Sequence, residues 1–100
     1  MSPFEALQLP NGQILPNRIA KAAMEENMAD GNQAPSRELK QLYKAWADGK
    51  PGVLITGNVM VDRRAMTGPG GVALEDEQHL ASFREWADVA RGNGVHFWVQ

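Results

Sequence analysis

A short apolar stretch near the middle of the chain sets the architecture; it reads Gly52-Val53-Leu54-Ile55-Thr56-Gly57. Its central residues are continuous, favour β structure and have a glycine on each side. An uninterrupted apolar strand is typical of a parallel sheet covered on both faces, because a half-exposed strand would alternate apolar with polar side chains. The stretch therefore predicts a buried parallel strand over 53–57.

Helices are predicted on both sides of this strand. Upstream, Ser36 suits an N-cap, and apolar residues then recur every three or four positions, which predicts a helix over 37–48. Gly49 suits the left-handed residue that ends such a helix. Downstream, Asp76 suits the cap of a second helix over 77–91.

Further strands are predicted nearer the two ends of the chain. A β-hairpin over 7–15 is indicated by alternating residues around Pro10-Asn11-Gly12, since Asn-Gly favours a tight turn. Residues 95–100 read as an apolar strand. Residues 19–24 have a composition that also suits a helix, but their place before the first helix favours a strand.

The predicted order is hairpin, strand, helix, strand, helix, strand, which gives a parallel sheet with helices outside it. A doubly wound sheet would place a phosphate-binding glycine pattern after the first strand, where this chain has Glu25-Glu26-Asn27. A (β/α)₈ TIM barrel needs no such pattern, and its active site lies at the carboxyl ends of its strands. Such barrels usually have about 250 residues. We therefore expect the N-terminal part of a single TIM-barrel domain, with about three of its eight strands.

Composition restricts the partners. The chain of 100 residues is 43% hydrophobic and 22% charged, with a formal net charge of −2. Neither nucleic acid nor an anionic membrane is expected as a partner, because there is no basic surface to attract one. The chain has no cysteine and no visible secretion signal, so a cytoplasmic enzyme with a small-molecule substrate is expected. Whether it forms a homo-oligomer is left open.

Three ordered motifs resemble the Old Yellow Enzyme family of flavin oxidoreductases. The first joins Leu9-Pro10-Asn11-Gly12, Leu15-Pro16-Asn17-Arg18-Ile19 and Met24. The second is the glycine-bounded stretch 52–57, and the third is Phe97-Trp98-Val99-Gln100. The resemblance covers essentially the whole chain.

The resemblance implies an enzyme that uses FMN. Hydride would pass from NADH or NADPH through FMN to an activated alkene or a similar acceptor. In the family, the groups that bind the substrate carbonyl and supply the proton lie beyond the third strand. We therefore name no catalytic residue and expect the 100-residue piece to be inactive alone.

The cofactor-binding residues that the resemblance implies lie at strand ends. They are Ala22, Ala23, Met24 and Glu25 after the first strand, Asn58 after the second, and Gln100 in the third. Gln100 matches a residue whose amide meets the polar edge of the flavin, and an amide can both donate and accept hydrogen bonds.

Three of these positions depart from the family pattern. Ala23 stands where proline is frequent, and Asn58 stands where a small residue is usual. Glu25 replaces a Thr or Cys that would donate a hydrogen bond, whereas an ionised carboxylate only accepts. A negative charge here would disfavour an anionic reduced flavin.

Other chemistry-bearing residues have simpler interpretations. Glu25-Glu26 has the composition of a solvated turn. No second ligand stands at suitable spacing from His79 or from His96, which could face a helix, so no metal site is expected. Trp46 and Trp86 suit helix packing. Arg63 and Arg64 suit either a phosphate contact or, more simply, a solvated surface.

Two alternatives to this function remain open from the sequence alone. The chain could begin a different (β/α)₈ enzyme, or it could be a non-catalytic half-barrel used as an assembly module. Flavin absorbance in the full-length protein would distinguish a flavin oxidoreductase from both alternatives.

Overall fold

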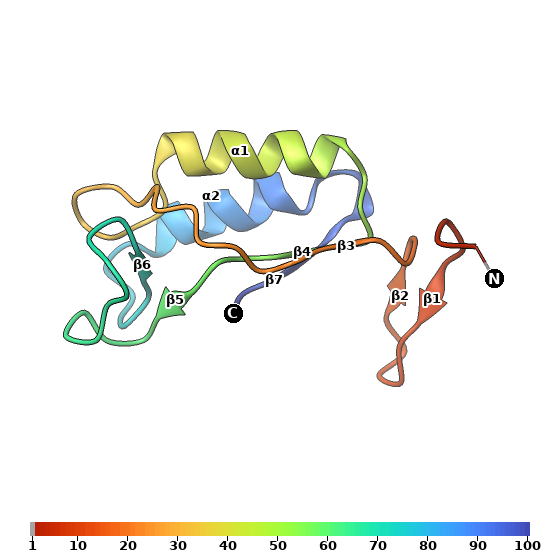
Figure 1. The fold of residues 1–100 in the computed structure, drawn as a ribbon, viewed down its shortest axis with the longest axis horizontal. Helices are drawn as coiled ribbons and strands as arrows, with labels where there is room; N and C mark the ends of the chain where they lie inside the picture. Colours follow the sequence, from red (N-terminus) through yellow and green to blue (C-terminus); the bar gives the residue numbers. More distant parts are fainter. Residues whose placement is uncertain (1) are drawn as a thin grey trace.

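The computed structural model describes residues 2–100, whose centre is a three-stranded parallel sheet. Its order is β3 (Ala20–Lys21), β4 (Val53–Ile55), β7 (His96–Trp98), and α1 and α2 lie together on one face of it (Figure 1). Lys21 pairs with Leu54, which pairs in turn with Phe97. The parallel register brings the carboxyl ends of all three strands to the same edge.

A separate antiparallel hairpin, β1 (Leu7–Gln8) and β2 (Ile14–Leu15), lies at the amino ends of the sheet strands (Figure 1). Its turn closes with the Gly12 N–H donating to the Leu9 carbonyl at 2.9 Å. Gly12 has a φ of 89°, a left-handed conformation that glycine adopts without strain. The Asn-Gly prediction of a turn is correct.

Helix α1 (Arg37–Asp48) begins and ends where the sequence predicts, with one difference at its end. The Ser36 side chain accepts a hydrogen bond from the Leu39 N–H at 3.0 Å, as expected of an N-cap. Gly49 was expected in the left-handed conformation, but its φ is −75°. Lys50 takes that conformation instead, with a φ of 60°, because the last helical turn continues through Gly49.

Helix α2 (Leu80–Ala90) begins later than residue 77. The Asp76 carboxylate accepts from the Gln78 N–H at 2.9 Å and so closes a turn before the helix rather than capping it. His79 occupies the cap position without a side-chain hydrogen bond. The 3₁₀ turn η1 (Gly92–Gly94) then leads into β7.

The long connection after β4 contains structure that its polar composition did not predict. The short strands β5 (Val59–Met60) and β6 (Val72–Ala73) pair in parallel beside the carboxyl end of the sheet (Figure 1). The three sheet strands are also shorter than predicted, because regular pairing stops where the chain turns toward the loops.

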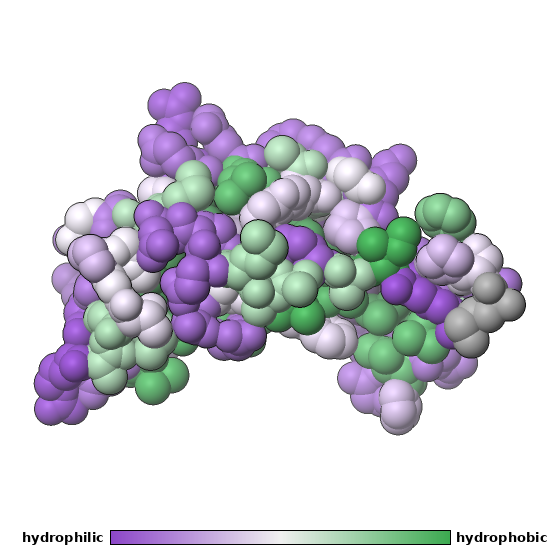
Figure 2. All heavy atoms as spheres, viewed as in Figure 1, coloured by the Kyte–Doolittle hydropathy of each residue, from purple (hydrophilic) through white to green (hydrophobic). Residues whose placement is uncertain are grey.

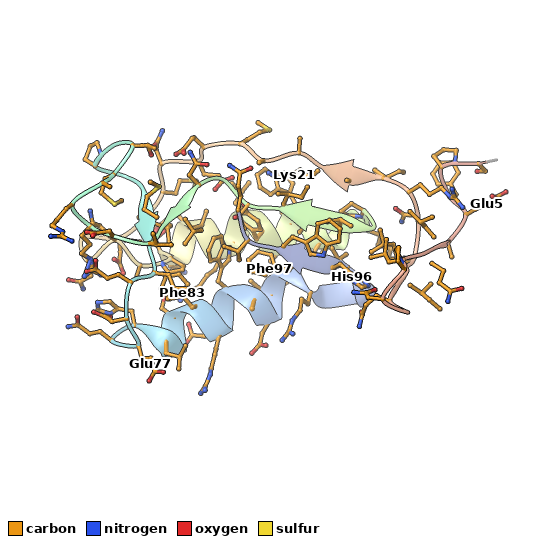
Figure 3. The ribbon with its side chains drawn as sticks, turned by 90° about the horizontal axis from the view of Figure 1, so that it is seen from below. Glu5, Lys21, Glu77, Phe83, His96 and Phe97 are labelled. Atoms are coloured by element: carbon orange, nitrogen blue, oxygen red, sulfur yellow. The ribbon has the colours of Figure 1, made fainter. Side chains whose placement is uncertain are left out.

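The core lies between the helices and the sheet and is built around aromatic rings. Tyr43 of α1 is fully buried, and its ring centroid lies 5.2 Å from that of Trp86 and 5.9 Å from that of Phe97. Phe97 of β7 faces the helices, whereas the neighbouring His96 lies toward the hairpin, 3.1 Å from the Ile14 carbonyl oxygen (Figure 3). The hypothesis that His96 faces a helix is therefore wrong, because side chains alternate along a strand.

The face of the sheet away from the helices is apolar and open. Leu15, Ile19, Val53 and Trp98 are among the residues lining a hollow of about 200 Å³ between this face and the hairpin. Hydrophobic side chains also gather at the surface around the hairpin, while polar ones predominate over α1 (Figure 2). Among residues 2–100, neither helix has the length and hydropathy needed to cross a membrane.

Gly52 allows the chain before β3 to lie against β4. A Cβ atom at this position would fall 2.3 Å from the backbone oxygen of Asn17. A residue with a side chain would fit at position 52 only if the chain before β3 moved.

We expect Gly52→Ala to lower the free energy of unfolding by about 1–3 kcal/mol, since it overpacks a backbone contact. Gly31→Ala is the matched control, because its added methyl group meets no atom within 4 Å; it should change the same quantity by less than about 0.5 kcal/mol. Denaturant unfolding measures both. Equal effects would contradict the proposed close approach.

Candidate functional site

A hollow of about 140 Å³ opens where the carboxyl ends of the three sheet strands meet. We call it the strand-end hollow. Its lining comes from all three strands: Ala23, Met24, Glu25, Gly57, Asn58 and Gln100. Short strands that stop at one edge therefore bring together residues more than 70 positions apart.

The strand-end hollow contains five of the six residues predicted to contact a cofactor. Ala22 is the exception; it is exposed and does not line the hollow. Met24 is 58% exposed, so its side chain is available rather than committed to the core. The contact of these residues with a flavin remains a prediction.

Gln100 is held in place by its backbone. Its N–H donates to the Thr56 hydroxyl oxygen at 3.0 Å, and its carbonyl accepts from the Val59 N–H at 2.9 Å. Its side-chain amide donates to the Asn58 side-chain oxygen. The Gln100 side-chain oxygen is thereby oriented, and Asn58, unusual for its size, acts as the partner that orients it.

At Gly57 the backbones of two segments of the site lie in close contact. A Cβ atom there would lie 2.3 Å from the Met24 carbonyl oxygen and 3.1 Å from the Glu25 Cα atom. The chain after β3 can follow the end of β4 only because residue 57 has no side chain. The sequence indicated Gly57 as a strand boundary but not as part of the site.

Behind the hollow, toward α1, lies a buried group of polar side chains that we call the Lys21–Glu26 cluster: Lys21, Glu26 and Tyr43. The Lys21 Nζ atom lies 3.9 Å from Glu26 Oε2, and the two side chains are 15% and 10% exposed. Glu26 Oε2 accepts a hydrogen bond from the Tyr43 hydroxyl at 3.1 Å. Lys21 Nζ has no hydrogen-bond partner but lies 4.7 Å from the centroid of the Trp46 ring, close enough for a cation–π contact.

Burial perturbs every member of this cluster. It raises the pKa of Glu26, an effect that the Tyr43 hydroxyl, the Lys21 charge and the Gly57 N–H partly offset. Burial also lowers the pKa of Lys21, against the attraction of Glu26. The pKa of Tyr43 is raised by burial and by the adjacent Glu26 carboxylate. For Glu26 the interpretation as part of a solvated turn is therefore wrong, whereas Glu25 is exposed as that interpretation requires.

The 61–71 segment does not line the strand-end hollow but contacts the chain that follows β3. The Ala29 N–H donates to the Gly70 carbonyl at 3.0 Å, and the Thr67 hydroxyl lies 3.5 Å from Glu25 Oε1. Arg63 holds the base of this segment, donating to Gln33 Oε1 at 3.0 Å and pairing with Glu75 at 3.3 Å.

The two arginines have different surroundings. Arg63 makes the contacts that fix the segment, whereas Arg64 is 90% exposed beside Asp62. Among residues 2–100 no cluster of His, Cys, Asp or Glu has the arrangement of a metal site.

The fold and this site define a class: a segment of a parallel α/β barrel whose site lies at the carboxyl ends of its strands. No family profile matches the chain. An NADH-dependent flavin oxidoreductase of Hypocrea jecorina is 37% identical over 93 residues, an alignment that covers 89% of this chain and 23% of that protein.

Solved structures agree in fold. An Old Yellow Enzyme homologue from Zymomonas mobilis superposes with a TM-score of 0.88 at 15% identity, over all of this chain and 27% of its own length. Morphinone reductase in complex with tetrahydroNAD gives 0.83 at 20% identity, over all of this chain and 26% of that one. The chain thus spans about a quarter of the length of these relatives. In sequence it is similar to part of the NADH-dependent flavin oxidoreductases, and in fold to one part of the barrel of Old Yellow Enzyme homologues.

The buried residues that support the site were not predicted from the sequence. Thr56 is fully buried and binds the Gln100 backbone, and Glu26 binds Tyr43. One signal was available: Lys21 is a charge within an otherwise apolar strand, and a buried lysine requires a nearby acid.

The raised pKa of Glu26 predicts how stability depends on pH. The folded state binds this proton more readily than the unfolded state, so the free energy of unfolding falls as pH rises from the ordinary value of 4.5 through the raised pKa. Glu26→Gln does not titrate and removes this contribution. Relative to E26Q, the native protein should lose stability over that window in denaturant titrations at several pH values. A relative stability that rises with pH would contradict the assignment.

Proposed function

We propose that the protein carrying this chain is an oxidoreductase that binds FMN, takes hydride from a nicotinamide cofactor and reduces an activated alkene or a similar acceptor. One observation carries the proposal: residues from three strands that the resemblance assigns to the flavin converge on one hollow. The name of the 37% identical relative supports the flavin and NADH.

The donor set of the strand-end hollow fits a flavin. The pyrimidine edge of the isoalloxazine ring presents both donors and acceptors, and the amides of Gln100 and Asn58 offer both kinds of group. Ala23 and Met24 add apolar surface for the flat ring. Bound FMN would supply the redox centre that accepts and returns hydride.

The chain's own residues act by binding and orienting. Asn58 holds the Gln100 amide, so the amide presents its oxygen without first losing rotational freedom. Gly57 lets the backbone of Met24 and Glu25 approach the end of β4. Glu25 is the one group that opposes the chemistry, because a carboxylate near the ring disfavours negative charge on the reduced cofactor.

We further propose that the flavin is FMN, that the reductant is NADH or NADPH, and that the protein is cytoplasmic. We also propose a small-molecule substrate, with no nucleic-acid or membrane partner. The open apolar face of the sheet, on which Trp98 is 44% exposed, supports the further proposal that these 100 residues are inactive alone. In a barrel that face packs against the remaining strands.

Gln100→Ala should weaken FMN binding to the full-length protein about tenfold or more, since it removes an oriented hydrogen-bonding group. Gln41→Ala, on the exposed surface of α1, is the matched control and should leave affinity unchanged. Fluorescence titration of the apoprotein with FMN measures both. Equal affinities for the native protein and Q100A would remove Gln100 from the site, and a full-length protein that binds no flavin would refute the function.

Glu25→Gln should raise the reduction potential of the bound flavin, because it removes a negative charge beside the reduced cofactor. The side chain keeps its size, so affinity should change much less than potential. Spectroelectrochemical or dye-equilibration titration gives the potential. An unchanged or lower potential would show that the carboxylate does not act on the flavin.

A further inference from the structure

The Lys21–Glu26 cluster does not line the strand-end hollow, but its member Glu26 belongs to the segment that forms one wall of that hollow. Glu26 directly follows Met24 and Glu25, which line the hollow. Its carboxylate accepts a hydrogen bond from the Tyr43 hydroxyl of α1 at 3.1 Å and lies 3.9 Å from Lys21 Nζ of β3. One side chain therefore connects the chain after β3 to the helix layer.

The segment that follows β3 lies outside the regular sheet. Regular pairing of β3 with β4 ends at Lys21 and Leu54, so residues 22–26 are not part of the ladder. The Gly57 contact limits how closely the two backbones approach, but it provides no attraction. The Glu26 carboxylate attracts the segment to the helix layer through Tyr43.

The charge of Glu26 has a counter-ion in the same layer. Lys21 Nζ lies 3.9 Å away and is otherwise surrounded by the rings of Trp46 and Tyr43. Removing one member of a buried pair leaves the other uncompensated, which costs more than the pair contributes. The cluster is therefore expected to act as a unit.

We propose that Glu26 is a positioning residue for the strand-end hollow: by joining the Tyr43 hydroxyl and pairing with Lys21, its carboxylate fixes the segment of Met24 and Glu25 to the helix layer beside the end of β4. The inference rests on the proposed function for the identity of the ligand. The geometry it assigns can be tested without any ligand.

Two variants of the full-length protein separate positioning from general stability. Glu26→Ala removes the hydrogen bond from Tyr43 and the counter-ion of Lys21, whereas Glu26→Gln keeps an oxygen that can accept from Tyr43 but loses the charge. Glu85→Ala is the matched control, because it removes a glutamate paired with Lys40 at 2.8 Å on the outer surface of the helices.

The first measurement is amide hydrogen exchange of the apoprotein. In E26A, the amides of Gly57 and of residues 24–27 should exchange about tenfold faster or more, while those of α1 residues around Leu39 stay protected; E26Q should lie between E26A and the native protein, because it keeps the acceptor for Tyr43 but not the charge. E85A should change none of these. Uniformly faster exchange in E26A, or no change at Gly57, would overturn the proposal.

The second measurement is FMN affinity, which should fall about tenfold in E26A and recover in part in E26Q. Unchanged FMN affinity in E26A would overturn the proposal even if exchange at Gly57 increased. A native protein that binds no FMN would instead refute the proposed function, and the exchange experiment would still decide whether Glu26 positions the strand end.

Discussion

The aromatic ring of Tyr43 holds the helices on the sheet, and its hydroxyl group reaches the Glu26 carboxylate beside the site. The ring lies edge-on to those of Trp46, Trp86 and Phe97, with centroids 5.0 to 5.9 Å away. Such contacts add about 0.5–1.5 kcal/mol each beyond the burial of area. A hydrogen bond to a charged group adds about 1.5–3 kcal/mol, so one side chain couples the core to the strand ends.

This coupling explains why the site lies where it does. Parallel pairing brings the ends of β3, β4 and β7 to one edge, but pairing stops before the residues that line the hollow. Beyond the ladder, position is set by individual contacts: Thr56 with the Gln100 backbone, Glu26 with its partners, and Gly57 through its missing side chain.

Much of the fold could be predicted from local patterns. The Asn-Gly turn, the Ser36 cap and the stripe of α1 each depend on neighbouring residues, and each is correct. The predicted start of α2 is wrong because an Asp such as Asp76 can either close a turn or cap a helix, and only the surrounding chain decides between the two. The β5–β6 pair escaped prediction because two-residue strands have no periodicity to detect.

The site, like the fold, could be predicted only in part from the sequence. Strand-end motifs placed five of six residues in one hollow, because parallel topology converts order along the chain into neighbourhood in space. The Lys21–Glu26 cluster could not be derived, since it depends on how the helix layer packs over a strand.

The most direct test of the whole account is a crystal structure of the full-length protein with FMN. The account predicts the flavin ring at the carboxyl ends of β3, β4 and β7, with Gln100 at its polar edge and Met24 beside it. A flavin bound at the hairpin end, or outside the barrel, would contradict the account.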